Sequence, residues 1–599
     1  MGRYMFDFSI KYNYVLNNFD VSNYLEQAEK ILENKLIFIH PWDMERTSTY
    51  YNIPKNWNEL VNEDEEWIFM RSRMNYFDPL FLSYEKSKDI KYINKIKEII
   101  FDFINKHKKL KYELSTRTLD SGIRMVNILK SIIYLKEINL ISKDEEDKIV
   151  KHLDDTCIYL FDAFVEKYFH SNWGYIQMAG IYTFGLMYNK KYAKRAKKYM
   201  KKQLEIQFLS DGLHIEKSMT YHYQMLIYTA WIVMIERLYD IKNSLFLKYL
   251  RKMVDSAQKL HYPNLRQINF GDSDDDNIED ILSMANAILK RKSKYMPKET
   301  SYMFAGSFLD DYEVIENILD KKEYFLKESG YYHLINKDYS FSTYLTNMTS
   351  GHLHVDLFHF NYFNKVEMLV DKGRYTYLEK NEDRNYLKSV RSHNSLVIDD
   401  KEFLNIKNSW EYSGNYPIIN PMERIEENGV VSLKLSAFDI DANAYIERRY
   451  ILCEDNVIII NRIYTKGKHK VKFYYNLHPK LSFNLESKRI LLNKEIYFEI
   501  GKYIIDEGTY SSKYNEKENN KVVMAEYEFV DKIQVIHKIL NKGVMFEEIE
   551  SDENIYSFKI TTKDKKYNIF CKNEDSIEKQ NVSYIQSSAI YNKFKVEIK

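Results

Sequence analysis

The sequence predicts a two-domain α+β protein, in which an all-α domain precedes an antiparallel β domain. Three observations predict this arrangement. The chain has 599 residues, whereas one hydrophobic core rarely serves more than about 250–300 residues. In the first half, apolar residues recur every three or four positions, which is typical of amphipathic helices. In the second half, short runs rich in aromatic and β-branched residues alternate with turn residues, which is typical of strands. We place the domains at residues 1–325 and 326–599.

The helical pattern extends from about Val21 to Asp320. Apolar side chains return on one face in several segments, among them residues 24–35, 92–109, 124–138 and 228–241. Short polar breaks separate about ten such segments, and no heptad repeat runs through them. This pattern predicts a layered or toroidal all-α domain rather than a coiled coil.

Strand-like runs follow in the second half of the chain. They include residues 331–336, 339–347, 430–438 and 456–464, which are short and bounded by turn residues. Such a series predicts a large antiparallel sandwich. Residues 500–599 continue in the same style, so we expect them to belong to the same domain.

The charge balance of the chain disfavours two classes of partner. The chain holds 88 Lys and Arg residues against 87 Asp and Glu residues, a net charge of +1. A balanced total does not favour nucleic acid or an anionic membrane. Residues 190–202 contain eight Lys or Arg residues. A solvated helix face is the first interpretation of such a run, although it could also attract a polyanion.

The cysteines and the N-terminal segment indicate a cytoplasmic protein. Cys157, Cys453 and Cys571 are widely scattered and odd in number, so they predict neither a disulfide framework nor a metal site. The N-terminal segment lacks the basic region, apolar core and cleavage site of an export signal. No apolar run approaches the roughly 18 residues of a membrane span. We therefore expect a cytoplasmic location.

Residues 351–363, GHLHVDLFHFNYF, are predicted to form a strand because aromatic and branched residues dominate them. Period two would place His352, His354 and Asp356 on one face of this strand. Two imidazoles and a carboxylate are costly to bury unless they bind something. The run is therefore a candidate functional strand.

A metal site is one use for these histidines. Asp371 ends one predicted strand and His393 precedes another, so a sheet could bring both close to His354. Two imidazoles and one carboxylate suit zinc or a similar divalent ion. Ordinary core histidines with hydrogen-bond partners are the alternative.

Two helical segments carry candidate polar and aromatic side chains. Asn172 begins the run NWGY between two apolar patterns. A helix start capped by Ser171 or Asn172 explains it, and an amide donor beside an aromatic wall is the functional alternative. Tyr221 and Tyr228 are seven residues apart, nearly two turns, so they share a face if a helix begins near Ser218. Two tyrosines on one face are more often half-buried core than catalytic.

The acidic run that starts at Asp272 does not match a calcium loop. An EF-hand needs Gly at position six and Glu at position twelve, where this chain has Asn277 and Ser283. We therefore expect a solvated turn, or a loop at the rim of a cleft.

The order of these motifs resembles the heparinase II/III-like polysaccharide lyases. The motifs are NWGY, DGLHIEKSMTYH, NFGDSD, GHLHVD, VDKGRYTY and RSHNSLVID, and the resemblance covers about residues 60–480. It implies an incomplete (α/α) toroid followed by an antiparallel β-sandwich. It also implies β-elimination on a uronic-acid polysaccharide, in which a base takes the C5 proton, a donor offsets the carboxylate charge and an acid protonates the leaving oxygen.

The matched motifs imply residue roles. Asn172 matches the Asn that neutralises the carboxylate, Tyr221 the proton donor, and Tyr228 a second Tyr that lines the site. His352 matches a histidine that acts as base when the C5 proton lies on the face opposite Tyr221. With the other uronate epimer, Tyr221 could serve as both base and acid.

The resemblance also implies a structural divalent metal, zinc in some members, held by three residues, His354, Asp371 and His393. Four further residues are expected to orient Tyr221 or to clamp carboxylate and sulfate groups, Arg being suited to this by its bidentate fork. They are His222, Glu216, Arg391 and Arg124, the last within a stretch at residues 115–127 that resembles the Arg-containing helix of the family.

The leading hypothesis is a lyase acting on an acidic polysaccharide or oligosaccharide. The balanced charge and the lack of an export signal favour imported oligosaccharides or a weakly sulfated polymer over intact heparin. A non-catalytic glycan-binding protein on the same scaffold is one alternative. A glycoside hydrolase is another, but it would need a pair of catalytic carboxylates, for which Glu216, Asp272 and Asp274 are the candidates.

Overall fold

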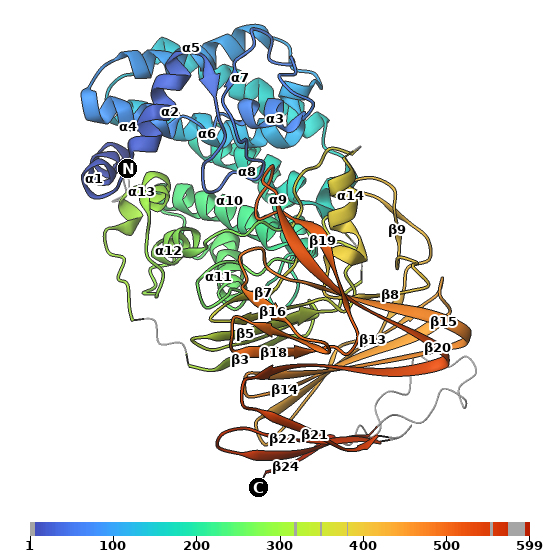
Figure 1. Cartoon of the computed structure of the whole chain (residues 1–599). Coiled ribbons are helices and arrows are strands. Elements are labelled where there is room, and N and C mark those ends of the chain that lie inside the picture. Colours follow the sequence, from blue (N-terminus) through green and yellow to red (C-terminus); the bar gives the residue numbers. More distant parts are fainter. Residues whose placement is uncertain are drawn as a thin grey trace.

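The computed structural model describes residues 6–316, 320–347, 350–379, 381–551, 555–572 and 594–598. A helical domain comes first and antiparallel sheets follow, as Figure 1 shows from blue to red. The helical part ends in a 3₁₀ turn at Gly306–Leu309, and the first strand of the sheets begins at Lys322. The predicted fold class is therefore confirmed.

The helical domain is built from helices of ordinary length. They are α1 (Phe8–Asn18), α2 (Ser22–Leu32), α3 (Glu66–Arg73), α4 (Asp78–Ser87), α5 (Lys91–Lys106), α6 (Thr118–Glu137), α7 (Lys143–Asp162), α8 (Asn172–Met187), α9 (Lys190–Gln207), α10 (Met219–Leu238), α11 (Leu245–Ala257), α12 (Glu279–Ile288) and α13 (Glu299–Ala305). A two-residue pair, β1 (Lys35–Leu36) with β2 (Tyr51–Asn52), lies between α2 and α3.

Three helices form the centre of this domain. Residues Met219 to Glu236 of α10 are all buried, as expected for a helix that is apolar around its whole circumference. The backbones of α6 and α8 are in contact at Gly122 and Gly180. A Cβ atom added at either glycine would lie only 2.6 Å from a main-chain atom of the other helix. This close packing fixes the start of α8, where Asn172 lies.

The β domain is built in layers. A five-stranded meander comes first, with β3 (Lys322–Leu326), β4 (Tyr331–Ile335), β5 (Tyr339–Tyr344), β6 (Phe360–Asn364) and β7 (Val366–Leu369) in sequential order. Its alternate residues face different layers. Tyr331 and Tyr344 pack into the helical domain, whereas Tyr332 and Phe341 pack against the next sheet.

The next layer is an eleven-stranded sheet. Its main order is β11 (Ile418–Ile419), β13 (Val430–Asp439), β14 (Ala444–Cys453), β15 (Asn456–Asn476), β20 (Glu518–Asn541), β18 (Ile496–Glu499), β17 (Arg489–Leu492) and β16 (Phe483–Leu485), and three strands pair from the side, β12 (Glu423–Glu427), β19 (Ile504–Tyr510) and β8 (Leu396–Ile398). Short elements connect the layers, namely α14 (Glu382–Lys388) and the pair β9 (Asn405–Ile406) with β10 (Tyr412–Ser413).

A four-stranded sheet covers the far face of the large one. It contains β21 (Met545–Ser551), β22 (Ile555–Thr561), β23 (Lys566–Lys572) and β24 (Phe594–Ile598). Ile459 of β15 packs toward the meander, whereas its neighbours Ile458 and Ile460 pack toward this outer sheet. The large sheet is thus buried on both faces.

The prediction of one strand over residues 351–363 is wrong for its first part. Residues 351–359 form a loop, and β6 begins at Phe360. The backbone of the loop bonds to other segments, since His352 O accepts from Asp272 N at 2.8 Å and Val355 N donates to Lys388 O at 2.9 Å. Phe358 has φ of 66°, which interrupts an extended chain.

The basic run forms α9, and most of its Lys and Arg side chains are exposed. Among the residues that the structure describes, no helix has the length and apolar character needed to cross a membrane.

Candidate active site

Asn172 is the first residue of α8 and is 1% exposed. Ser171 caps the helix, because its hydroxyl accepts from Trp173 N at 3.2 Å. The Asn172 side chain is thereby left for another task. Its Nδ2 donates to Glu216 Oε2 at 2.8 Å and its backbone N donates to Glu216 Oε1 at 3.2 Å, while its Oδ1 is buried without a partner. Glu216 therefore orients the amide.

Tyr221 lies in the first turn of α10, after the cap residue Ser218. Its ring stacks on His352, with centroids 3.7 Å apart and an interplanar angle of 26°. Its hydroxyl lies 2.6 Å from the hydroxyl of Tyr377. Burial, with a further contribution from Tyr377, raises the pKa of Tyr221 well above its ordinary value. The phenol is therefore held in its protonated form.

Tyr377 is held in turn by an arginine. Arg374 Nη1 donates to the Tyr377 hydroxyl at 2.6 Å, and the same guanidinium binds the carboxylate of Asp274 at 2.7 and 2.8 Å. With Arg374 donating to its oxygen, Tyr377 is free to direct its own proton to Tyr221.

His352 is oriented by Asp272. His352 Nδ1 lies 3.0 Å from Asp272 Oδ2, and Asp272 Oδ1 lies 2.9 Å from His354 Nε2. Arg384 binds both oxygens of the same carboxylate, at 2.6 and 3.0 Å. Burial opposes the charge of Asp272, but Arg384 and the two histidines hold its pKa well below its usual range. One ionised carboxylate thus positions both histidines.

The expectation of a solvated turn at Asp272 is therefore wrong. Asp272, Ser273 and Asp274 are at most 1% exposed. The physical reason is that arginines from the β domain, Arg384 and Arg374, each neutralise one of the two aspartates. The sequence around Asp272 does not show these partners, which lie 100 or more positions further along the chain.

His354, Asp371 and His393 lie together, with one potential ligand atom from each within 4.8 Å of the others. His393 Nδ1 lies 3.1 Å from Asp371 Oδ2. Two ring nitrogens, His354 Nδ1 and His393 Nε2, are buried without a hydrogen-bond partner. Two unpartnered imidazole nitrogens beside a carboxylate fit a divalent ion such as zinc. Asp356 lies outside this trio and accepts from the Tyr344 hydroxyl.

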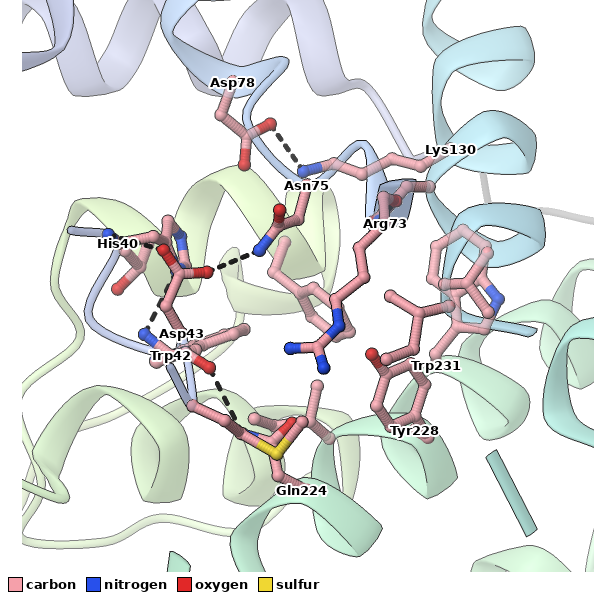
Figure 2. A pocket seen from close by; sticks show the side chains of 17 residues that line it. His40, Trp42, Asp43, Arg73, Asn75, Asp78, Lys130, Gln224, Tyr228 and Trp231 are labelled. Atoms are coloured by element: carbon pink, nitrogen blue, oxygen red, sulfur yellow. Dashed lines mark hydrogen bonds and ion pairs between the residues drawn. The ribbon is translucent and has the colours of Figure 1, made fainter. Parts of the chain in front are cut away.

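The other predicted site residues lie partly in the cluster around Asn172, Tyr221 and His352 and partly elsewhere in the helical and β domains. Tyr228 lies two turns beyond Tyr221 and lines a cavity of about 80 Å³, shown in Figure 2. Glu216 is part of the cluster, with its Oε2 4.0 Å from His352 Nε2. Arg391 is exposed in the turn Val390–Ser392, and among the residues that the structure describes it makes no hydrogen bond or ion pair with the cluster.

Arg124 and His222 have structural partners instead. Arg124 is 1% exposed, donates to the carbonyls of Ser72 and Ser115 at 3.0 and 3.1 Å, and lies over the Phe103 ring. His222 Nε2 lies 3.0 Å from Met253 O. These contacts place both side chains in the helical core, so we replace their expected substrate contacts with packing roles.

Four residues of the cluster were missed from the sequence, namely Arg374, Tyr377, Arg384 and Trp410. Arg374 and Tyr377 lie in the motif VDKGRYTY, where an Arg and a Tyr close to the metal candidate Asp371 were the available signal. Trp410 follows β9 and is 40% exposed. The centroid of its ring lies 5.3 Å from that of the His352 ring and 4.5 Å from that of the Tyr377 ring.

The structure joins a helical domain to layered antiparallel sheets, and Asn172, Tyr221 and His352 lie where the two parts join. The family model described as "Heparinase II/III N-terminus" matches residues 8–304. The family model described as "Heparinase II/III-like, C-terminal" matches residues 320–538. The chain belongs to the heparinase II/III-like polysaccharide lyase family.

Solved structures share this fold over nearly the whole chain. A heparinase III is 17% identical with a TM-score of 0.69, covering 92% of this chain and 91% of its own. The heparan sulfate lyase HepC from Pedobacter heparinus is 14% identical with a TM-score of 0.61, covering 93% and 90%. A chondroitin AC lyase from Streptomyces coelicolor A3 is 7% identical with a TM-score of 0.58, covering 94% and 90%. No curated protein sequence matches this chain significantly.

Proposed function

We propose that the protein cleaves a uronic-acid-containing glycan by β-elimination and leaves a 4,5-unsaturated uronate. The observation that carries the proposal is the convergence of Asn172, Tyr221 and His352. Glu216 holds the Asn172 amide at 2.8 Å and lies 4.0 Å from His352 Nε2, and the His352 ring stacks on Tyr221. An amide donor, an imidazole and a phenol are the three groups that this elimination needs.

Asn172 would offset the charge of the uronate carboxylate. When the C5 proton leaves, negative charge spreads from C5 into the carboxylate, and fixed donors stabilise that charge best. Glu216 fixes the amide before substrate binds, because it accepts from both the side chain and the backbone of Asn172. A neutral amide supplies a donor without binding the anionic product too tightly.

His352 would be the base. A hydrogen bond from Nδ1 to the Asp272 carboxylate holds the tautomer in which Nε2 carries the lone pair. Nε2 then takes the C5 proton, and the electrons of the C5–H bond form the C4–C5 double bond as the C4–O bond breaks. Asp272 remains ionised beside Arg384 and stabilises the imidazolium that forms.

Tyr221 would be the acid. Its raised pKa keeps the phenol protonated, and the phenolic proton passes to the leaving glycosidic oxygen. The Tyr377 hydroxyl, 2.6 Å away, can donate to the tyrosinate that remains, and Arg374 stabilises the shared negative charge. Proton transfers are thereby balanced, with one proton taken at C5 and one delivered to the leaving oxygen.

A divalent metal, zinc for example, would be held by His354, Asp371 and His393. When bound, it would supply a rigid link between the loop that carries His352 and the segments that carry Asp371 and His393. The support is the pair of unpartnered ring nitrogens beside Asp371. Asp272 completes the arrangement, because it accepts from His354 Nε2 and leaves Nδ1 of that ring available as a metal ligand.

The substrate is proposed to be weakly sulfated. Sulfate groups need cations that are not already neutralised, whereas Arg374 and Arg384 at the cluster are bound to Asp274 and Asp272. The net charge of the chain is only +1. A weakly sulfated uronate polymer or oligosaccharide fits these charges better than heparin.

The test is to incubate the purified protein with heparan sulfate, heparosan, hyaluronan, chondroitin and alginate. We expect ultraviolet absorbance from the unsaturated uronate to rise with at least one of them. Tyr221→Phe and His352→Ala should abolish that rise while keeping the far-ultraviolet circular dichroism of the wild type. No absorbance from any uronate polymer would contradict the proposal. A saturated product would favour a glycoside hydrolase instead.

A further inference from the structure

We propose that the loop of residues 40–46 closes one end of the substrate cleft, so that the enzyme acts on chain ends rather than inside the polymer. This inference rests on the proposed lyase function. Asp43, Met44, Glu45 and Arg46 of the loop are only 4–6% exposed. The second half of the loop is therefore part of the packed interior, and its position is fixed by contacts on both sides.

One set of contacts ties the 40–46 loop to the helical domain. The Trp42 indole donates to the Asp280 carboxylate at 3.0 Å, and Gln224 of α10 donates to Trp42 O at 3.2 Å. Arg46 pairs with Asp276 at 2.9 Å. These contacts involve a helix that carries a catalytic residue, since Tyr221 lies one turn before Gln224 on α10.

A second set of contacts ties the loop to the β domain. Asn515, in the turn between β19 and β20, donates to Arg46 O at 2.7 Å. Arg374 donates to Met44 O, and the same guanidinium donates to Tyr377 at 2.6 Å. The loop thus bridges the two domains, and a single side chain separates it from the Tyr221–Tyr377 pair.

The space behind this bridge is too small for a polymer. The cavity beside Tyr228 measures about 80 Å³, and Trp42, Asp43 and Met44 of the loop form one of its walls. Trp231 and Phe304 of the helical domain also line the cavity, and Figure 2 shows Trp231 beside Tyr228. Ligand pockets usually enclose roughly 300–1,000 Å³. A glycan end that reached Tyr228 would therefore find no room for further sugar units behind the loop.

The charges of this cavity define the end unit. Its two cations are neutralised, since Lys130 pairs with Asp78 at 2.7 Å and Arg73 binds Glu45 and Asp120 at 2.6 and 2.7 Å. Figure 2 shows the Lys130–Asp78 contact and the loop residues Trp42 and Asp43 around the same space. Paired charges and aromatic walls suit the hydroxyls and the apolar face of an uncharged sugar. A sulfated end unit would find no free cation.

The remainder of the substrate leaves on the side of Trp410. This indole is 40% exposed, whereas Tyr221 and His352 are 5% and 9% exposed. Its ring lies against both His352 and Tyr377. An exposed aromatic face beside the reacting groups provides a stacking surface for the sugar units that extend into solvent.

The test follows product length during digestion of an unsulfated uronate polymer that the wild type cleaves. We expect the smallest unsaturated product to accumulate from the start, while size-exclusion chromatography shows the remaining polymer at nearly its original length. A ladder of intermediate lengths and a rapid fall in polymer length would overturn the inference and leave the lyase function intact. Absence of any unsaturated product would contradict the lyase function, and this inference with it.

A loop variant tests the wall itself. Arg46→Ala combined with Asn515→Ala removes one tie to each domain, and we expect intermediate-length products to appear. Arg424→Ala is the matched control, because Arg424 of β12 pairs with Glu323 of β3 within the β domain and makes no ion pair with the loop in the part of the chain that the structure describes. Trp42→Ala serves as a second variant if the double variant fails to fold. An unchanged product pattern in a folded loop variant would overturn the role of the 40–46 loop.

Discussion

The helical side and the β side of the active site position their residues by different means. On the helical side, Asn172 and Tyr221 lie in the first turns of α8 and α10, after the cap residues Ser171 and Ser218. On the β side, His352 lies on a loop without regular structure. Helix geometry fixes Asn172 and Tyr221, whereas buried charged residues fix the position of His352.

The β side is fixed by two ion pairs that cross the domain junction. Asp272 with Arg384 orients His352, and Asp274 with Arg374 orients Tyr377. All four charged residues are at most 1% exposed. Breaking a buried pair leaves an uncompensated charge. We therefore expect mutations on the helical side to reduce activity and mutations of these pairs to reduce stability as well.

Tyr221→Phe is expected to have the largest effect on activity. Loss of a general acid typically lowers kcat by about 10²–10⁴-fold. Because the helix start is unchanged, the melting temperature should stay near that of the wild type. Kinetics of unsaturated product release together with thermal unfolding measure both quantities. A variant with full activity would remove Tyr221 from the mechanism.

Arg384→Met is expected to have the largest effect on stability. It leaves the buried Asp272 carboxylate without its arginine partner, and removal of one partner of a buried pair costs about 3–5 kcal/mol of unfolding free energy. Arg424→Met is the control, because its pair with Glu323 is partly solvated and such pairs contribute about 0–1 kcal/mol. Denaturant unfolding measures both variants. Equal losses of unfolding free energy in the two variants would show that the buried ion pair contributes no more to stability than the partly solvated one.

Metal removal tests the other support of the β side. Elemental analysis of the purified wild type should find a divalent metal, and His393→Ala should lose it together with several degrees of melting temperature. A chelator should lower the melting temperature of the wild type in the same direction. A wild type without metal, or an unaltered content in His393→Ala, would leave these histidines as core residues.

Tyr377→Phe is expected to have a smaller effect. It removes one hydrogen bond to Tyr221, and a hydrogen bond of this kind contributes about 0.5–1.5 kcal/mol. The value of kcat should therefore fall by roughly 2–10-fold, since 1.4 kcal/mol corresponds to a factor of about 10. KM should stay within error. A loss as large as that of Tyr221→Phe would make Tyr377 the direct proton donor.

Arg391→Ala is expected to have the smallest effect. The side chain is exposed and lies outside the cluster, and surface substitutions usually change stability by less than about 0.5 kcal/mol. The ratio kcat/KM should match that of the wild type. A large rise in KM would restore the predicted contact with the substrate and would extend the β side beyond the two ion pairs.

Sequence and structure agree best where periodicity carries the information. The helical and strand patterns gave the fold class and the order of the domains, and the spacing of Tyr221 and Tyr228 follows from a helix that does begin beside Ser218. The loop before β6 was mistaken for a strand, because aromatic composition does not reveal that its backbone bonds to Asp272 and Lys388.

The charged part of the site was the least predictable. Asp272 looked like a surface acid because its partner Arg384 lies 112 positions away. Arg124 and His222 looked like site residues from their neighbours in sequence, yet their hydrogen bonds to Ser72 and Met253 bury them elsewhere. Pairing across a domain junction is tertiary information, which local patterns do not contain.

The most direct test of the central claim is the mass of the new chain end released from a uronate polymer or oligosaccharide. If His352 and Tyr221 carry out β-elimination, that end is lighter by one water molecule than the end left by hydrolysis, and Tyr221→Phe releases neither. A new end with the full mass of a hydrated uronate, formed by the wild type, would contradict the account.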